Sequence, residues 1–202
     1  MIQIYGQVAS RTARCLWTAA EIDLEFEHIK INQQAGESRT PEFLKINPNG
    51  HVPALVDGDL VLCESMAINL YLADKYGPQL SFDSPEKRAL AAQWSFWSIF
   101  ECELNIVTIL QHKVFLPEEQ RDAARAAEAE AALPAPLKVL NDALAGKQYL
   151  IDDRFSIADL NVASVLVFAS LMEYDFSPYS NLANWLGRCL SRPAMAKVES
   201  YR

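Results

Sequence analysis

The alternation of apolar and polar positions changes several times near the start of the chain. Residues 2–5 form a short apolar run, and residues 25–31 alternate with the two-residue period of a β-strand. Between them, residues 11–21 carry apolar side chains at helical spacing. This order of strand, helix and strand predicts a βαβ unit, in which the two strands run parallel.

The next segments predict a short helix, a hairpin and a longer helix. Proline at the start of residues 41–44 is typical of the first helical turn. Two apolar runs on either side of Asp57-Gly58-Asp59 favour a β-hairpin. An amphipathic helix follows over residues 64–76 and ends at Gly77. We therefore predict a small α/β domain over residues 1–76.

The remainder of the chain predicts only helices. Residues 77–85 are rich in Gly, Pro and Ser and are interpreted as a linker. A long helix is expected over residues 86–113, and a second helix is expected from Pro117 with a restart near Pro134. Further helices are expected from Ser156, from near Asn181 and from near Pro193. We predict an all-helical domain over residues 86–202.

Two features of these helices have a structural interpretation. On the long helix, a stripe of mostly large side chains is expected to lie mainly in the core, and it consists of Trp94, Trp97, Phe100, Leu104 and Thr108. Glu101 and Glu103 on the same helix are either exposed helix acids without a special role or residues that reach across an interface between two copies of the chain. At the start of a later helix, Ser156 and Asp159 have the spacing of a capping pair, which predicts a folding role.

The composition excludes several classes of protein. Half of the 202 residues are apolar, which allows a sizeable core, and the formal net charge is −8, which argues against a nucleic-acid partner. No stretch reaches the roughly 20 apolar residues of a membrane span, and the N-terminus lacks the pattern of a signal peptide. The four cysteines are far apart and histidines are few, so we expect no metal site and reduced thiols in the cytoplasm.

An unusual proline lies within residues 47–59. Pro48-Asn49-Gly50 is a turn signal, and Pro53 follows at the start of the apolar run Ala54-Leu55-Val56. Proline has no backbone N–H to give to a neighbouring strand. One interpretation is that Pro53 bends the chain so that Val52 offers its backbone to a ligand.

Four segments together resemble the soluble glutathione transferase family over essentially the whole chain. They are IYGQVASRTARCLW, PEFLKINPNGHVPALVDGD, LCESMAINLYLADKYG and GKQYLIDDRFSIADL. The resemblance implies a thioredoxin-like N-terminal domain that binds glutathione as co-substrate, and an all-helical domain that contributes the pocket for an electrophile. It also implies a cytoplasmic homodimer that acts in detoxification on small, fairly apolar electrophiles.

The resemblance assigns roles to the residues that would hold glutathione. Pro53 resembles the cis-proline of the family, and Val52 would pair with the cysteinyl backbone of glutathione through its own N–H and C=O. Glu64 would pair with the ammonium group of the γ-glutamyl end, while Ser65 would hold the carboxylate of that end. Capping and the dipole of the helix 64–76 also explain Glu64 and Ser65 without a ligand.

The sequence offers two candidates for the cation that would contact the glycyl carboxylate of glutathione, His51 and Arg39. Many relatives carry lysine where this chain has His51, and a mostly neutral imidazole would make a weaker, pH-dependent contact. His51 is equally well explained as a solvent-exposed turn residue. Arg39 is a second candidate for the cation.

Two residues are candidates for activating the glutathione thiol. Ser10 precedes the first helix, so it can act as a plain N-cap, or its hydroxyl can donate to a thiolate at a helix N-terminus. It matches the serine-type branch of the family, such as the theta and delta classes and many bacterial members. Tyr5, at the end of the first strand, is where tyrosine-type members carry their hydroxyl. We favour Ser10, and we expect Cys15 to be buried.

The favoured function is conjugation of the glutathione thiolate to an electrophile. Peroxide reduction, dehalogenation and isomerisation are alternatives on the same scaffold, and so is a non-catalytic binding or regulatory module. A redox protein of the thioredoxin type is disfavoured because the chain has no CxxC pair.

Overall fold

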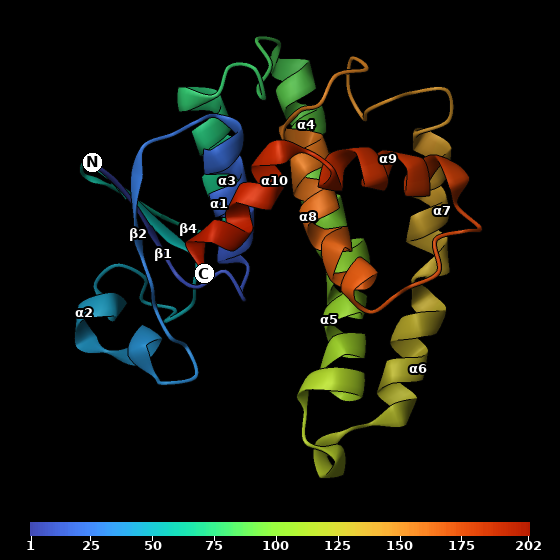
Figure 1. Cartoon of the computed structure of the whole chain (residues 1–202), viewed down its shortest axis with the longest axis horizontal. Helices are drawn as coiled ribbons and strands as arrows, with labels where there is room; N and C mark the ends of the chain where they lie inside the picture. The colour runs from blue at the N-terminus through green and yellow to red at the C-terminus, as the bar shows by residue number, and fades with distance from the viewer. The chain divides into compact units, whose positions relative to one another are not determined.

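The protein, seen here in a computed structural model that describes residues 1–202, consists of two compact units (Figure 1). The first comprises Met1–Ser84 together with Ser191–Arg202, and the second comprises Pro85–Leu190. The change from one unit to the other therefore falls inside the predicted linker. The end of the chain differs from the prediction of a helical domain over residues 86–202, because its last residues belong to the first unit.

The first unit contains a four-stranded mixed sheet. Its strands are β1 (Ile2–Tyr5), β2 (Phe26–Ile29), β3 (Ala54–Asp57) and β4 (Leu60–Cys63), in the order β2-β1-β3-β4 (Figure 1). The strands β1 and β2 are parallel, whereas β3 pairs antiparallel with both β1 and β4. The predicted βαβ unit and the predicted hairpin are both confirmed.

Helices cover both faces of this sheet. The helices α1 (Thr12–Glu21) and α3 (Ser65–Tyr76) pack on each other and on one face, where Ile4 and Leu55 are completely buried. The short helix α2 (Pro41–Leu44) contributes Phe43 to a cluster on the other face with Tyr5, Val52 and Ala54. Ala54 and Leu55 belong to different clusters because successive side chains of a strand point to opposite faces.

The end of the chain belongs to the first unit because α10 (Pro193–Val198) packs against α1 (Figure 1). The guanidinium group of Arg192 donates two hydrogen bonds, of 2.7 and 2.8 Å, to the carboxylate of Glu21. Lys197 forms a further ion pair with Asp23 at 3.0 Å. A bidentate arginine–carboxylate pair fixes the orientation of both groups, so these contacts set the position of α10 on α1.

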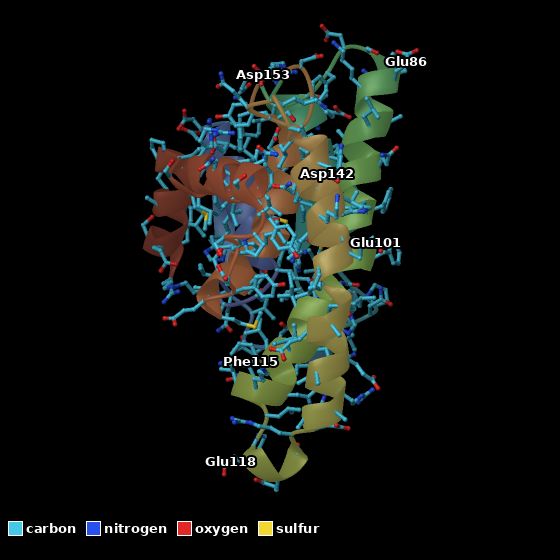
Figure 2. All side chains as sticks on the ribbon, turned by 90° about the vertical axis from the view of Figure 1, so that its right-hand side faces the viewer. Glu86, Glu101, Phe115, Glu118, Asp142 and Asp153 are labelled. Carbon is cyan, nitrogen blue, oxygen red and sulfur yellow. The ribbon has the colours of Figure 1, made fainter.

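The second unit begins with one long helical path. It consists of α4 (Pro85–Trp97), a π-helical stretch (Ser98–Glu103), α5 (Leu104–Leu110) and a second π-helical stretch (Gln111–Phe115). Figure 2 shows Glu86 and Phe115 near the two ends of this path. The single predicted helix over 86–113 is therefore present, but its turns are not uniform. Such π-helical insertions shift the direction in which the following side chains point.

The core face of this long helix differs from the prediction. Phe100 is 66% exposed and Leu104 is 59% exposed, so the expectation that they are core residues is wrong. The side chains that face the core are mostly smaller, and they are Ala91, Ser95, Ser98, Cys102 and Ile106. Small side chains let α8 (Ile157–Leu171) approach α4 closely, and Asn161 of α8 donates a hydrogen bond of 2.8 Å to the hydroxyl of Ser95.

The two acidic residues Glu101 and Glu103 of the same helix differ in their exposure to solvent. Glu101 is exposed, as predicted, and Figure 2 shows it on the long helix. Glu103 is only 3% exposed, so its interpretation as an exposed helix acid is wrong. The sequence did not reveal this because the π-helical stretch changes which positions face inward.

The remaining helices begin close to the predicted positions, with one exception. The helix α6 (Ala123–Ala132) begins after Pro117, because Asp122 caps it by accepting hydrogen bonds from the backbone N–H groups of Ala124 and Arg125. A new helix, α7 (Pro134–Ala143), starts at the proline, as predicted. The helix α9 (Ser180–Leu190) follows α8. None of the helices combines the length and apolar character needed to cross a membrane.

The capping pair at the start of α8 is confirmed and makes additional contacts. The completely buried carboxylate of Asp159 accepts hydrogen bonds from the backbone N–H and the hydroxyl of Ser156, at 3.0 and 2.9 Å. It also accepts hydrogen bonds of 2.9 Å from the backbone N–H of Leu150 and the indole of Trp185. Asp159 therefore joins α8 to the preceding loop and to α9.

Candidate functional site

The register of the sheet brings three chain segments to one edge. Tyr5 lies opposite Ala54, and Ala54 lies opposite Cys63. The end of β1, the start of β3 and the end of β4 therefore form one row across the sheet. The segments that continue from this row are residues 6–10, the residues just before Ala54, and the residues just after Cys63. These segments contain Ser10, Val52, Glu64 and Ser65.

Gly6 holds the end of β1 against its neighbours. Its φ angle is +131°, and a Cβ atom at this position would lie 2.0 Å from the hydroxyl oxygen of Thr12 and 2.9 Å from Cβ of Val52. Only glycine fits such a close approach in this backbone conformation. Gly6 thus brings the start of α1 and the backbone around Val52 into contact with the end of β1.

The peptide bond between Val52 and Pro53 is cis, which confirms the expectation that Pro53 is a cis-proline. The preceding turn is rigid, because the side-chain amide of Asn47 donates to the carbonyl of His51 at 2.7 Å and accepts from the N–H of Asn49 at 3.1 Å. The backbone N–H and carbonyl of Val52 make no hydrogen bond within the chain. Strong backbone donors and acceptors normally have partners when buried, so Val52 has two groups available for a ligand.

Ser10 lies in the turn between β1 and α1. Its hydroxyl is within hydrogen-bonding distance of the carbonyl of Gln7, at 2.7 Å, and of the hydroxyl of Thr12, at 2.9 Å. It also accepts a hydrogen bond of 3.1 Å from the backbone N–H of Thr12. The helix α1 begins at Thr12, and Arg11 occupies the N-cap position. Ser10 therefore lies one residue before the N-cap, and its hydroxyl accepts from the N–H of the first helical residue.

Tyr5 is placed differently. Its ring packs against Phe43 with 6.2 Å between the ring centroids, and its hydroxyl donates a hydrogen bond of 2.9 Å to the side chain of Gln3. Gln3 lies two residues earlier on β1, so the ring extends back along the strand, away from residues 6–10. Burial, together with the charge of Glu27, raises the pKa of the Tyr5 phenol.

Glu64 and Ser65 form the start of α3. Glu64 flanks the helix in a left-handed conformation with a φ angle of 70°, which costs a non-glycine residue about 1–3 kcal/mol and often marks a functional site. Its side chain is exposed, whereas Ser65 is buried. A helix N-terminus favours anionic groups through its free N–H groups. This end of α3 therefore offers a carboxylate for a cation and a hydroxyl with N–H groups for an anion.

Sequence reasoning gave no role to Arg14, which lies beside this helix end. The side chain of Arg14 is 2% exposed and donates a hydrogen bond of 3.3 Å to the hydroxyl of Ser65. Thr12, which contacts Ser10, was also missed. The sequence did contain a signal for Arg14, because this arginine lies among the apolar positions of residues 11–21. A charged side chain on the buried face of a helix needs a partner.

Arg39 and His51 lie on either side of the same turn. Arg39 donates a hydrogen bond of 3.0 Å to the carbonyl of Asn49. Its guanidinium group covers Gly50, where a Cβ atom would lie 2.6 Å from a guanidinium nitrogen. His51 is exposed directly after this glycine. The structure thus brings the two candidate cations to one turn, next to Val52.

The cysteines do not form part of the site. Cys15 is completely buried, as expected, and burial raises the pKa of its thiol, so it is a poor nucleophile. None of the four cysteines forms a disulfide. No three side chains of the His, Cys, Asp and Glu types are close enough together to hold a metal ion.

Comparison with known protein families identifies the family to which the chain belongs. Residues 2–74 match the N-terminal domain of glutathione S-transferases, and residues 101–193 match their C-terminal domain. The chain belongs to the glutathione S-transferase family. The resemblance that the four sequence segments suggested is therefore confirmed, and so is the predicted fold of a mixed-sheet domain followed by a helical domain.

Individual members of the glutathione S-transferase family match over the whole chain. The glutathione S-transferase GstB of Escherichia coli K12 is 33% identical, over 98% of this chain and 97% of its own length. A glutathione S-transferase of Hyoscyamus muticus is 32% identical, over 100% of this chain and 99% of its own length.

Solved structures of the family are similarly close. The theta-class enzyme of Xanthomonas axonopodis pv. citri, solved with glutathione bound, has a TM-score of 0.89 at 33% identity, covering 97% of this chain and 95% of its own. Glutathione S-transferase-I, bound with lactoylglutathione, also has a TM-score of 0.89 at 31% identity, covering 100% of this chain and 99% of its own.

Proposed function

We propose that this protein is a glutathione transferase that conjugates the thiolate of glutathione to small, fairly apolar electrophiles. The single observation that carries the proposal is the backbone of Val52, whose N–H and carbonyl have no partner within the chain. They lie at the sheet edge where residues 6–10 and the start of α3 also meet. A peptide laid along this edge gains two backbone hydrogen bonds, as in strand addition.

The two ends of glutathione suit the groups on either side of Val52. At the start of α3, Glu64 would pair with the ammonium of the γ-glutamyl end, and Ser65 would donate to its carboxylate. The hydroxyl of Ser65 accepts from Arg14, which leaves its own proton free for that carboxylate. At the other end, Arg39 and His51 are the cations that would contact the glycyl carboxylate.

Ser10 is the proposed activator of the thiol. Its hydroxyl lies just before α1, and it can turn from the carbonyl of Gln7 to donate to a sulfur anion. A free thiol with a pKa of about 8.5 is only a few per cent ionised at pH 7, and lowering this pKa by about two units stabilises the thiolate by about 2.7 kcal/mol. The placement of the Tyr5 hydroxyl on Gln3 supports Ser10 over Tyr5.

The proposal includes a cytoplasmic homodimer. Four cysteines without a disulfide suit a reducing compartment. The large exposed side chains of Phe96, Phe100 and Leu104 recur every four residues on one helical path of the second unit. An exposed apolar stripe of this kind suits contact with a second copy or with an apolar substrate.

The test is retention on immobilised glutathione, elution with free glutathione, and then a conjugation assay on a panel of electrophiles. The expected result is specific retention and measurable conjugation. Retention without conjugation of any electrophile would favour a binding or regulatory module. A folded protein that is not retained and has no detectable affinity for glutathione in calorimetry would overturn the proposal.

A further inference from the structure

A histidine of β2 contacts the loop that carries Ser10. The Nε2 atom of His28 lies 2.8 Å from the carbonyl oxygen of Gly6, the first residue after β1. A carbonyl oxygen only accepts hydrogen bonds, so Nε2 carries a proton and the imidazole is the donor. His28 is not among the residues proposed to hold glutathione or to activate its thiol.

Gly6 is the point at which the chain leaves the sheet. Its N–H continues the parallel pairing with β2 by donating to the carbonyl of Ile29 at 2.9 Å. Its carbonyl accepts from His28 of the same strand. Because a peptide unit is planar, a fixed carbonyl of Gly6 also fixes the direction of the N–H of Gln7. The two hydrogen bonds to β2 therefore set the direction in which the loop to α1 begins.

The start of this loop determines where Ser10 lies. The carbonyl of Gln7 accepts hydrogen bonds from the backbone N–H and the hydroxyl of Ser10, at 3.1 and 2.7 Å. Gly6 also lies against Thr12, whose hydroxyl is 2.9 Å from the hydroxyl of Ser10. A displacement of Gly6 would therefore reach Ser10 by two short routes, one through Gln7 and one through Thr12.

The end of the chain holds the imidazole of His28 in place. His28 and Phe26 are two residues apart on β2, so they point to the same face of the sheet. The ring of Tyr201 contacts both, with centroid distances of 6.1 Å to His28, edge-on, and 5.5 Å to Phe26. Figure 1 shows the C-terminus close to these strands. Tyr201 follows α10, which Arg192 ties to α1. The imidazole thus has a defined orientation, with Nε2 toward Gly6.

We propose that His28 is a positioning residue for the transfer reaction, which holds the loop between β1 and α1 so that the Ser10 hydroxyl meets the sulfur of glutathione. His28 does not touch glutathione and acts through Gly6. This inference rests on the activating role proposed for Ser10. One net hydrogen bond shifts a local equilibrium about two- to tenfold, so loss of the contact lets the loop leave the orientation that presents Ser10.

The test compares two amide substitutions of His28. His28→Gln places an N–H donor as many bonds from the backbone as Nε2, whereas the amide of His28→Asn is one bond shorter and does not reach Gly6. Thiolate absorbance against pH gives the pKa of bound glutathione. We expect His28→Asn to raise this pKa by up to about one unit and to lower turnover near neutral pH by up to about tenfold. His28→Gln should restore both, and the affinity for glutathione in calorimetry should change little.

A double variant shows whether His28 acts through Ser10. In a protein that already carries Ser10→Ala, His28→Asn should cause no further rise in the thiol's pKa, because effects that pass through one shared group do not add. A general loosening of the fold would reduce activity in both backgrounds. His112→Asn is the matched control, since it makes the same substitution at a partly exposed histidine of the second unit. It should leave the pKa of the thiol unchanged.

His28→Leu also removes the donor, so the test stands if His28→Asn does not fold. The proposal is overturned if a folded variant without the donor keeps the parent's thiol pKa while Ser10→Ala raises it. It is also overturned if His28→Gln is no better than His28→Asn, or if the double variant shows the sum of the two single effects. A parent protein without affinity for glutathione, or Ser10→Ala without effect, would instead contradict the proposed function and this inference with it.

Discussion

The guanidinium group of Arg14 on α1 donates a hydrogen bond of 3.3 Å to the hydroxyl of Ser65, the first residue of α3. Both side chains are buried, at 2% and 5% exposure. A cation held behind a helix N-terminus adds to the positive end of the helix dipole. Ser65 is therefore oriented with its acceptor side toward Arg14 and its proton available to an anion. This relationship explains why the start of α3 suits a carboxylate.

Glu64→Gln should weaken the binding of glutathione, because the ligand's ammonium loses the carboxylate proposed to hold it. A charge-assisted hydrogen bond contributes about 1.5–3 kcal/mol, which corresponds to a loss of about 10- to 100-fold in affinity. Glutamine keeps the size of the side chain and tests charge alone. The measurement is calorimetric titration, with Glu42→Gln on α2 as an exposed control. Unchanged affinity in a folded Glu64→Gln protein would remove Glu64 from the site.

Ser10→Ala should raise the pKa of the bound glutathione thiol and reduce turnover near neutral pH. Affinity for glutathione should change little, because the tripeptide is held through Val52, Glu64 and Ser65. The deficit in turnover should shrink as the pH rises toward the free thiol's pKa of about 8.5, where ionisation needs no help. The measurement is thiolate absorbance against pH with glutathione bound.

Tyr5→Phe is the matched comparison for Ser10→Ala, and it should leave the thiol's ionisation nearly unchanged. A shift with Tyr5→Phe and none with Ser10→Ala would reverse the assignment of the activating hydroxyl. No shift in either variant would assign the activation to backbone N–H groups and the dipole of α1.

Asp159→Ala should destabilise the second unit without altering chemistry at the glutathione site. The substitution leaves the backbone N–H groups of Leu150 and Ser156 and the indole of Trp185 without their acceptor. Each buried unsatisfied donor costs about 1–3 kcal/mol, so we expect a loss of roughly 3 kcal/mol or more, above that of a simple cap. Denaturant unfolding measures it. Collapse of turnover with unchanged unfolding would contradict this structural role.

The stabilising contribution of Asp57 to the first unit should be lost in acid. Its carboxylate accepts hydrogen bonds from Lys75, Tyr71 and Tyr76 of α3, and these bonds hold its pKa below the usual range. Because the folded-state pKa is depressed, the stabilisation is complete above the unfolded pKa of about 4 and is lost as the pH falls through the folded pKa.

Asp57→Asn should therefore lower the free energy of unfolding by about 1–2 kcal/mol at pH 7, a value reduced by partial exposure to solvent. The difference from the parent protein should narrow steadily below pH 4. Urea unfolding over a pH series checks this, with the exposed Asp59→Asn of the same hairpin as control. A difference that stays constant down to pH 2 would mean that the ionised carboxylate is not what stabilises the native state.

Much of the local structure was predictable because its signals lie close together in the chain. Proline at the start of α2 and of α7, the hairpin around Asp57-Gly58-Asp59, and the capping pair Ser156 and Asp159 each depend on a few neighbouring residues. The candidate ligand residues were recognisable for the same reason, since the turn at residues 47–53 and the start of α3 are local motifs.

Other features depended on packing between distant segments. Phe100 and Leu104 have the spacing of a core stripe, but their part of the long helix includes a π-helical stretch, and smaller side chains face inward toward α8. Periodicity shows that a helix has two faces, and it does not show which face the neighbouring helix will cover. The return of α10 to α1 likewise depends on Arg192 and Glu21, which lie 171 residues apart.

The amino-acid sequence on its own determined the order of the elements and the two-domain character, which follow from short-range periodicity, caps and turns. Its resemblance to a known family supplied the candidate residues for contacting glutathione. Only the tertiary structure decided that Arg14 supports Ser65, from 51 positions away, and that the Tyr5 hydroxyl is bonded to Gln3. The physical reason is that a buried polar group is satisfied by whichever partner the packed fold brings within reach, and sequence spacing carries no record of that partner.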